Sequence, residues 1–320
     1  MRILVTGGAG FIGSTLVTEL LKEGHEVTVL DSLTWGIQGL SLNFGKRGFD
    51  FVKGDIRDDK LITRVLENKD VIVHLAALVG CDLCDLDRKH ATEVNVNGSR
   101  KISDALSENQ LLIYASTGSV YGQVHEAICT EKTPPNPQSH YARTKFEAEN
   151  IFSKRKNTVI LRFATAFGVS YRMRLDLLVN QFVYEAIKQR ALIVYGKNYV
   201  RSIVHVQDIA RSILFAINNK ESMKGQTFNV GSSDLAFTKE QIARRITKQV
   251  DFSLQFAEST SDGDGRNYVL STRKIEALGY RAKVSLDQGI MELIWAVNKS
   301  KIDKTCFNFQ FPLTEFAITL

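Results

Sequence analysis

A glycine-rich turn near the start of the chain limits the available folds more than any other feature. The run RILVT is apolar and β-branched, as buried parallel strands are, and GGAG separates it from FIGSTLVTELLKEG, whose apolar residues recur at helical spacing. Glycines at such a junction let the backbone turn tightly and approach a pyrophosphate at the positive end of the helix. The pattern predicts a dinucleotide-binding unit, with packing glycines in a tight turn as the alternative. The expected cofactor contacts here are Gly7, Gly10, Phe11, Ile12 and Gly13.

Five further segments carry the same strand signal: EVTVL, FDFV, DVIVHLA, LLIYAS and TVILRF. The segments between them are long enough for crossover helices, which predicts an α/β fold with a Rossmann-like, doubly wound parallel sheet. We expect residues 1–165 to form this domain, with 201–231 returning to it. Residues 166–200 and 232–300 are expected to form a smaller mixed α/β substrate lobe, and 301–320 a tail of unknown role.

Shorter patterns beyond Phe167 set the expected elements of that lobe. Strands are predicted at ALIVY and RSIVHV. Helical spacing predicts helices at 175–189, 207–219, 239–250, 272–278 and 286–297.

Composition excludes several classes of protein. Hydrophobic residues make up 44% and charged residues 24% of the chain, the usual balance of a globular protein. The four cysteines are too few and scattered for a secreted disulfide framework, which favours a cytoplasmic location. No apolar run is long enough for a membrane helix, and Cys81 and Cys84 lack partners at metal-ligand spacing, so neither membrane nor metal binding is expected.

Asp31 lies at the end of the second predicted strand, where a carboxylate can accept hydrogen bonds from the ribose of adenosine. No Arg or Lys follows it until Lys46, so a 2′-phosphate would meet an uncompensated negative charge. The position predicts NAD rather than NADP. The alternative is an aspartate that only caps a turn.

Tyr141 and Lys145 stand four residues apart in YARTK and therefore share one face of a predicted helix. A nearby ammonium favours the phenolate form of tyrosine, although a solvated surface pair is the alternative. ASTGSVYG brings clustered hydroxyls to the carboxyl end of another strand, where ligands bind in this architecture. A Ser/Thr-rich turn that bonds its own backbone is the competing explanation there.

These motifs together resemble a known family. TGGAGFIGS, Asp31, GDIRD, HLAA, ASTGSVYG, YARTK, LRF and RSIVHVQDIA follow the order and spacing of the extended short-chain dehydrogenases/reductases, from Met1 to about Val297. The sequence is similar to their NAD-dependent epimerase/dehydratase family, which acts on nucleotide sugars. AALVG with its Cys-containing loop, and RMRLDLLVNQF, look most similar to the branch containing GDP-heptose 4-dehydrogenases.

The resemblance implies a role for each matching residue. Thr117 would bond the reacting sugar hydroxyl, Tyr141 would remove its proton, and Lys145 would bond the nicotinamide ribose and lower the pKa of Tyr141. The other implied NAD contacts are Asp55, Ile56, Leu75, Ala76, Ala77, Phe163 and Ala164. The expected substrate contacts are Val79, Thr117, Gly118, Ser119, Thr165, Arg172, Arg174, Arg201 and Arg266. Among these, Arg201 and Arg266 match positions that grip the sugar nucleotide's diphosphate, which suits guanidinium groups.

Two departures from the family pattern bear on the reaction. Gly118 and Ser119 stand where the family's 4,6-dehydratases carry the Asp-Glu pair that eliminates water. Thr165 replaces a common Asn, and Arg172 and Arg174 are candidates to compensate for its lost diphosphate contact. The expected activity is therefore oxidation of a sugar hydroxyl, at C4, by an epimerase or 4-dehydrogenase.

Two alternatives stay open: a 4,6-dehydratase-like enzyme, and a non-catalytic NAD-binding sensor or RNA-binding relative. The surplus of 41 Lys and Arg over 35 Asp and Glu, +6 in all, suits an anionic small ligand better than nucleic acid once these arginines are placed in the substrate lobe. The family also implies a homodimer formed through helices at about 92–106 and 141–154.

Overall fold

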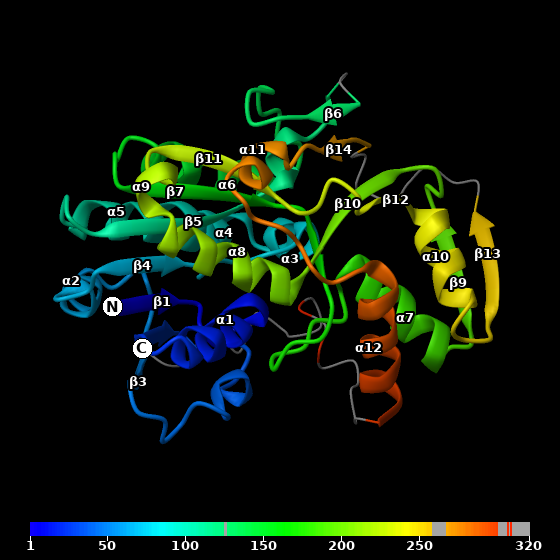
Figure 1. Cartoon of the computed structure of the whole chain (residues 1–320), viewed down its shortest axis with the longest axis horizontal. Coiled ribbons are helices and arrows are strands. Elements are labelled where there is room, and N and C mark those ends of the chain that lie inside the picture. Colours follow the sequence, from blue (N-terminus) through cyan, green and yellow to red (C-terminus); the bar gives the residue numbers. More distant parts are fainter. Residues whose placement is uncertain (125–126, 258–266, 300–305, 307, 309–320) are drawn as a thin grey trace.

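A seven-stranded parallel sheet forms the larger part of the molecule, in the order β3-β2-β1-β4-β5-β7-β11 (Figure 1). The computed structural model describes residues 1–124, 127–257, 267–299, 306 and 308. The strands of this sheet are β1 (Arg2–Thr6), β2 (Glu26–Asp31), β3 (Phe49–Lys53), β4 (Val71–His74), β5 (Leu111–Thr117), β7 (Thr158–Phe163) and β11 (Gln226–Val230).

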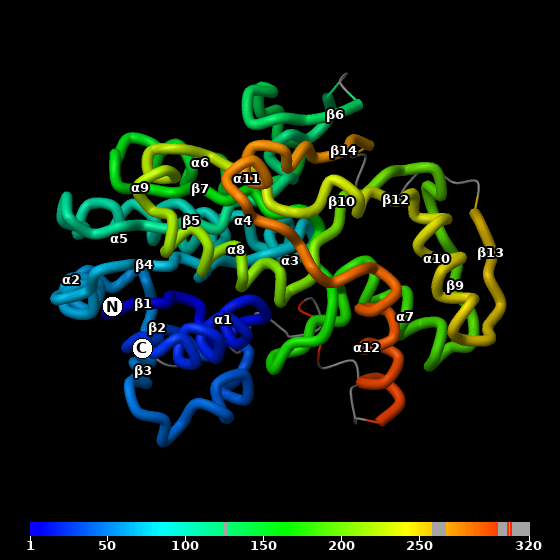
Figure 2. The backbone as a smooth tube through the Cα atoms, in the orientation of Figure 1, coloured from blue at the N-terminus to red at the C-terminus, as the bar shows by residue number. Residues whose placement is uncertain are grey.

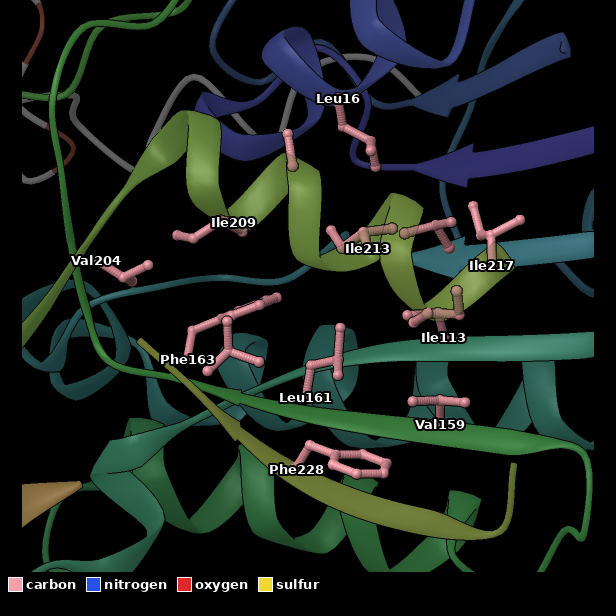
Figure 3. Packing of buried hydrophobic residues seen from close by; sticks show 14 of the residues in the cluster. Leu16, Ile113, Val159, Leu161, Phe163, Val204, Ile209, Ile213, Ile217 and Phe228 are labelled. Atoms are coloured by element: carbon pink, nitrogen blue, oxygen red, sulfur yellow. The ribbon is translucent and has the colours of Figure 1, made fainter. Parts of the chain in front are cut away.

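Both faces of the sheet are buried, which explains why its strands are apolar without alternation. Ile3 and Val5 point to a core shared with α1 and α8, whereas Leu4 points to the core on the opposite face. Figure 3 shows α8 packed over β5, β7 and β11 through side chains such as Ile213 and Leu161. The helices flanking the sheet are α1 (Phe11–Lys22), α2 (Asp59–Leu66), α5 (Ser99–Ala105), α6 (His140–Phe152) and α8 (Val206–Asn218).

The predicted doubly wound α/β class is confirmed by this arrangement. Within 201–231, β11 joins the main sheet and α8 covers it, whereas β10 (Val200–His205) pairs with β8 (Thr165–Phe167) and β12 (Ala236–Thr238) in a separate three-stranded sheet. The helix expected at 92–106 is interrupted, because a π-helical turn at Glu93–Gly98 joins α4 (Arg88–Thr92) to α5.

A second group of elements packs beside the carboxyl ends of the main strands (Figure 2). Its core lies between α7, α10, α12 and the two-stranded sheet of β9 and β13, with Phe182, Ile246 and Leu293 among the buried side chains. These elements are α7 (Leu178–Lys188), β9 (Ala191–Tyr195), α10 (Lys239–Thr247), β13 (Ser253–Ala257) and α12 (Leu286–Lys299).

The helix α7 begins later than the predicted 175–189. Leu177 is extended, with φ −83° and ψ 138°, and Leu175 donates its backbone N–H to the carbonyl of Cys306, 3.0 Å away. A contact with the far end of the chain therefore replaces the first helical turn, and local sequence carries no signal for such a contact.

The remaining described elements are short. They are α3 (Cys81–Leu86), α9 (Lys220–Met223), α11 (Arg273–Ala277), the paired strands β6 (Ile128–Cys129) and β14 (Val269–Leu270), and 3-10 turns at Gln38–Leu40 and Gly118–Tyr121. Within the described part of the chain, every helix is too short or too polar to cross a membrane.

Candidate active site

A cavity of about 1080 Å³ opens at the carboxyl ends of β1, β2, β4 and β5. The strand order reverses between β1 and β4, which is where ligands bind in open α/β sheets. Every predicted site residue lines this cavity except Arg266, which falls outside the described residues. Thus the motifs quoted from distant parts of the sequence meet at one place.

The glycine turn has the geometry that a dinucleotide phosphate requires. Gly7 has φ +72°, and a Cβ there would lie 2.6 Å from the backbone nitrogen of Ala76. A Cβ at Gly13 would lie 2.3 Å from the carbonyl oxygen of Gly7, so glycine lets the turn and α1 close on each other. Within the described part of the chain, no side chain caps α1 at Gly10, and its first turn holds no acidic residue. The positive end of this helix therefore faces the cavity, and the residues present fit the pyrophosphate of NAD.

Asp31 ends β2 at the rim of the same cavity. Its carboxylate accepts hydrogen bonds from the backbone N–H groups of Ala9 and Leu33, at 2.9 and 2.8 Å. Burial raises the pKa of Asp31, against the lowering influence of these two N–H groups and of Arg172. The carboxylate is thus fixed beside the glycine turn, where it can also accept from ribose hydroxyls.

The predicted adenine segment lies along the next part of the wall. Asp55 pairs with Arg57 at 2.6 Å, and although burial opposes its ionisation, the bonds from Arg57 hold the pKa of Asp55 below its usual value. Ile56 is buried. Arg57 and His90 also line this end of the cavity and were not predicted from the sequence. Arg57 lies within GDIRD, where only Asp55 and Ile56 were expected as contacts, and no motif marks His90.

The loop after β4 is held by an internal polar network. The Thr6 hydroxyl lies 2.7 Å from Nδ1 of His74 and accepts from the backbone N–H of Ala76 at 3.3 Å. Asn95 receives the N–H of Leu78 at 2.8 Å and donates to its carbonyl at 3.0 Å. These bonds fix Leu75, Ala76 and Ala77 along the cavity wall.

The hydroxyl cluster predicted after β5 forms a short turn. The Thr117 hydroxyl caps it by accepting the N–H of Ser119 at 3.1 Å, and it lies 3.1 Å from the Ser119 hydroxyl. Thr117 also lies close enough to Tyr141 to act on its pKa in the lowering direction. A sugar hydroxyl placed here would meet a phenol and an aliphatic hydroxyl together, as the chemistry of alcohol oxidation requires.

Tyr141 and Lys145 lie one turn apart on α6, as their spacing predicts. Burial raises the pKa of Tyr141 to about 12, with Arg174 and Thr117 acting in the lowering direction. Burial lowers the pKa of Lys145 to about 7, and its ammonium lies 4.3 Å from the ring centroid of Tyr114. The protein alone therefore leaves the phenol protonated, and an added positive charge is needed to acidify it.

The cysteine-containing segment adjoins this pair. Val79, Gly80 and Leu83 line the cavity, and the buried thiol of Cys84 donates to the carbonyl of Leu78 at 3.4 Å. Burial raises the pKa of Cys84 to about 12, as expected for a packed thiol rather than a reactive thiolate. Within the described ranges, no group of three His, Cys, Asp or Glu residues is arranged to hold a metal ion.

The predicted arginines occupy different parts of the wall. Arg172 is stacked on Trp35 near Asp31, whereas Arg174 pairs with Asp176 and influences the pKa of Tyr141. Arg201 is 4% exposed and donates to the carbonyl of Val200 at 3.0 Å.

The rest of the predicted set lies nearby. Gly118 receives a hydrogen bond from the hydroxyl of Tyr268 on its carbonyl oxygen. Phe163 ends β7, and Ala164 and Thr165 continue along the wall. Other lining residues that were not predicted from the sequence include Trp35, Leu177, Tyr268, Leu270 and Asn308. Leu177 lies within RMRLDLLVNQF, where only the arginines were expected as contacts, and the other four come from segments with no motif of their own.

A doubly wound sheet, a glycine turn beneath a helix, and a Tyr-x-x-x-Lys pair in one cavity define a dinucleotide-dependent oxidoreductase of the short-chain type. The family model described as "NAD dependent epimerase/dehydratase family" matches residues 3–231, and the chain belongs to this family. Its cofactor is NAD, and its members act on nucleotide sugars as epimerases or dehydratases.

Individual relatives span nearly the whole chain. The low-salt glycan biosynthesis protein Agl12 of Haloferax volcanii is 31% identical over 305 residues, covering 91% of this chain and 96% of the relative. The structure of a dTDP-glucose 4,6-dehydratase from Streptomyces venezuelae, solved with NAD, is similar at a TM-score of 0.83 and 30% identity, covering 93% and 98%. The structure of a UDP-glucose 4-epimerase of Thermus thermophilus in complex with NAD is similar at a TM-score of 0.80 and 29% sequence identity. The match covers 94% of this chain and 100% of the other. The GDP-heptose branch is not among the names of these relatives and stays a prediction.

Proposed function

We propose that this enzyme oxidises the C4 hydroxyl of a nucleotide-diphosphate sugar and reduces the resulting ketone again, as a 4-epimerase. The observation that carries the proposal is the meeting of Thr117, Tyr141 and Lys145 with the glycine turn in one cavity, with Gly118 and Ser119 where elimination would need carboxylates. Bound NAD supplies a reversible two-electron acceptor for the C–H bond of the sugar carbon.

In this proposal the side chains of the chain move and hold the proton. The Thr117 hydroxyl orients the C4 hydroxyl, and the Tyr141 oxygen takes its proton as the C–O single bond becomes a carbonyl. The ammonium of Lys145 stabilises the phenolate against the effect of burial, which raises the pKa of Tyr141 to about 12. A nicotinamide bound here would add a second positive charge. After the keto sugar rotates, the hydride would return to the opposite face of C4 and the proton would return from Tyr141 to the C4 oxygen. This gives the other epimer and completes a redox-neutral cycle.

The carboxylates of the cavity support epimerisation over elimination. In the described part of its wall they are Asp31, Asp55 and Asp87. Asp31 accepts two backbone N–H groups, Asp55 pairs with Arg57, and Asp87 caps α4 through the N–H of His90 at 2.8 Å. Each is engaged in holding local structure, so a dehydratase lacks an available acid and base to remove water from the sugar.

For the nucleotide part, Arg201 and Arg174 are the proposed diphosphate contacts beside the hydroxyl cluster. Both lie in the cavity wall, and guanidinium groups suit the paired oxygens of a diphosphate. Arg266 is proposed as a further contact by resemblance. Thr165 stands where the family commonly has an Asn that contacts the diphosphate. In this proposal the arginines, rather than Thr165, bind the diphosphate charge.

The test is to incubate the purified enzyme with UDP-, dTDP-, CDP- and GDP-linked hexoses and a GDP-heptose, and to follow both sugar products and absorbance of reduced cofactor. The expected result is interconversion of C4 epimers without net NADH. Formation of one NADH per keto sugar would contradict the 4-epimerase and assign a 4-dehydrogenase activity instead. A product lighter by one water would establish a dehydratase and remove the argument from the carboxylates.

A further inference from the structure

Arg172 is a buried cation on the cavity wall that forms no salt bridge with a carboxylate in the described part of the chain. It is 8% exposed, and within the described ranges no carboxylate forms a salt bridge with its guanidinium. Burial, together with repulsion from Arg174, lowers the pKa of Arg172 to about 10, although Asp176 and Asp31 act in the raising direction. A ligand of opposite charge placed in the cavity would stabilise a buried charge of this kind.

Two neighbours hold the Arg172 guanidinium in place. Its carbon lies 4.8 Å from the ring centroid of Trp35, and one of its nitrogens donates to Oδ1 of Asn308 at 2.7 Å. Trp35 follows Asp31 in the loop after β2, whereas Asn308 lies near the end of the chain and is 2% exposed. All three residues line the cavity, and the guanidinium retains further N–H donors for a ligand.

The backbone before Arg172 is fixed to the phosphate-binding end of α1. The Ser170 hydroxyl donates to the carbonyl of Phe11 at 2.5 Å and lies 2.9 Å from the hydroxyl of Ser14. The Arg172 N–H is 3.3 Å from the same Ser14 hydroxyl. Arg172 is thereby tied to the helix whose first turn carries the glycine pattern.

We propose that Arg172, Trp35 and Asn308 form a clasp that binds the diphosphate of NAD and slows release of the cofactor. The proposal rests on the placement of NAD against the glycine turn that the proposed function uses, and it does not depend on which sugar is the substrate. The nucleotide sugar also carries a diphosphate, but the ties of Arg172 to α1 and its influence on Asp31 favour the cofactor.

The clasp has a functional consequence for a redox-neutral cycle. In this proposal the contacts among Trp35, Arg172 and Asn308 must open before the cofactor leaves. Retention of NAD through both half-reactions keeps the electrons on the enzyme, which an epimerase needs and a dehydrogenase that exchanges NADH does not.

Trp35 provides a direct reporter for this test. The chain has 2 tryptophans, and the other, Trp295, is 66% exposed on α12. In a Trp295→Phe background, fluorescence of Trp35 measures NAD binding, and stopped-flow displacement by excess ADP-ribose measures the dissociation rate. Arg172→Met is expected to raise that rate by about tenfold or more, since a desolvated cation–π contact and a charged hydrogen bond are both removed.

Controls separate the clasp from general damage. Arg244→Met removes another arginine stacked on an aromatic ring, 5.4 Å from the centroid of Phe256 and outside the cavity, and should leave the NAD dissociation rate unchanged. Asn308→Ala removes the hydrogen bond between Arg172 and Asn308 and leaves residues 170–172 unchanged. It should raise the NAD dissociation rate several-fold. Circular dichroism and unfolding of each cofactor-free variant verify that the fold is intact.

The outcomes assign the ligand. Faster NAD release in Arg172→Met and Asn308→Ala, with UDP or GDP affinity of the NAD-loaded protein unchanged, is the expected result. An unchanged NAD dissociation rate in folded Asn308→Ala and Arg172→Met overturns the clasp, and weakened nucleoside diphosphate binding in the same variants would assign Arg172 to the substrate. If these variants lose sugar turnover but release NAD at the normal rate, the clasp is contradicted, while binding of NAD at the glycine turn is not. If Gly13→Val still binds NAD, binding of NAD at the glycine turn is refuted.

Discussion

Lys145 is the residue whose chemistry the fold changes most clearly. Burial lowers its pKa to about 7, with Cys84 and Glu149 acting in the raising direction. In the unfolded chain a lysine titrates near pH 10.5. Between these values the unfolded chain binds more protons than the folded one, so the contribution of Lys145 to stability rises with pH.

This linkage gives a measurable slope. The free energy of unfolding of the cofactor-free wild type, minus that of Lys145→Met, should rise between pH 7 and pH 9.5 by at most about 1.4 kcal/mol per pH unit. Urea unfolding curves at matched ionic strength provide the measurement. Tyr141 does not interfere, because its pKa is raised to about 12. A difference that is flat or falls with pH would show that Lys145 stays charged in the fold.

Tyr141 is the residue on which turnover depends. Tyr141→Phe keeps the ring and removes the proton acceptor, so turnover should fall by about 10²- to 10⁴-fold, the usual contribution of a positioned general base. NAD content after desalting should match the wild type, because the glycine turn is unchanged. Turnover of Tyr141→Phe at the wild-type rate would show that Tyr141 is not the proton acceptor. Absence of turnover in both proteins would favour the non-catalytic sensor.

The glycine turn and α1 are the element whose geometry is most demanding. A Cβ at Gly13 would lie 2.3 Å from the carbonyl oxygen of Gly7, whereas one at Gly10 would lie 3.2 Å from the same atom. Gly13→Ala should therefore cost about 1–3 kcal/mol of stability through overpacking and weaken NAD binding. Gly10→Ala is the matched variant, for which a smaller loss is expected. Thermal unfolding and NAD titration of both give the comparison, and equal effects would refute the steric argument.

Elements were predictable where burial is periodic and local. The strands at 158–163 and 191–195 have the predicted bounds, because apolar runs between turns admit few alternatives. The predicted start of α7 at residue 175 was wrong, because Leu175 instead bonds to Cys306, which is far away in the sequence. Trp35 and Asn308 were not predicted to line the cavity for the same reason, since only contacts between distant segments bring them there. The motif residues could be placed at one sheet edge from sequence, but the partners that hold them depend on tertiary contacts.

At the scale of the whole molecule, the cavity lies between the main sheet and the second group of elements. Its wall takes Gly10 and Asp31 from the sheet side, and Leu177 and Arg201 from the segments that lead into the other elements. A ligand in this cavity therefore bridges both parts and stabilises them against unfolding together. Homodimerisation through α6 and the segment 92–106 stays a prediction, which light scattering of the purified protein tests.

The same bridging predicts how the substrate's base can be found. With NAD present, the cognate nucleotide sugar at about 100 times its dissociation constant should add about 2.7 kcal/mol of stability, while the wrong bases add less at equal concentration. Thermal unfolding across UDP-, dTDP-, CDP- and GDP-linked sugars makes the comparison, with Arg244→Met as a surface-charge control and Arg201→Met as the variant expected to lose the shift. The net charge of +6 alone would attract any polyanion, so salt matters: a ligand held in the cavity keeps its shift in moderate salt. Retention of RNA that disappears with salt, together with no shift from any nucleotide sugar, would contradict a nucleotide-sugar site and favour the RNA-binding alternative.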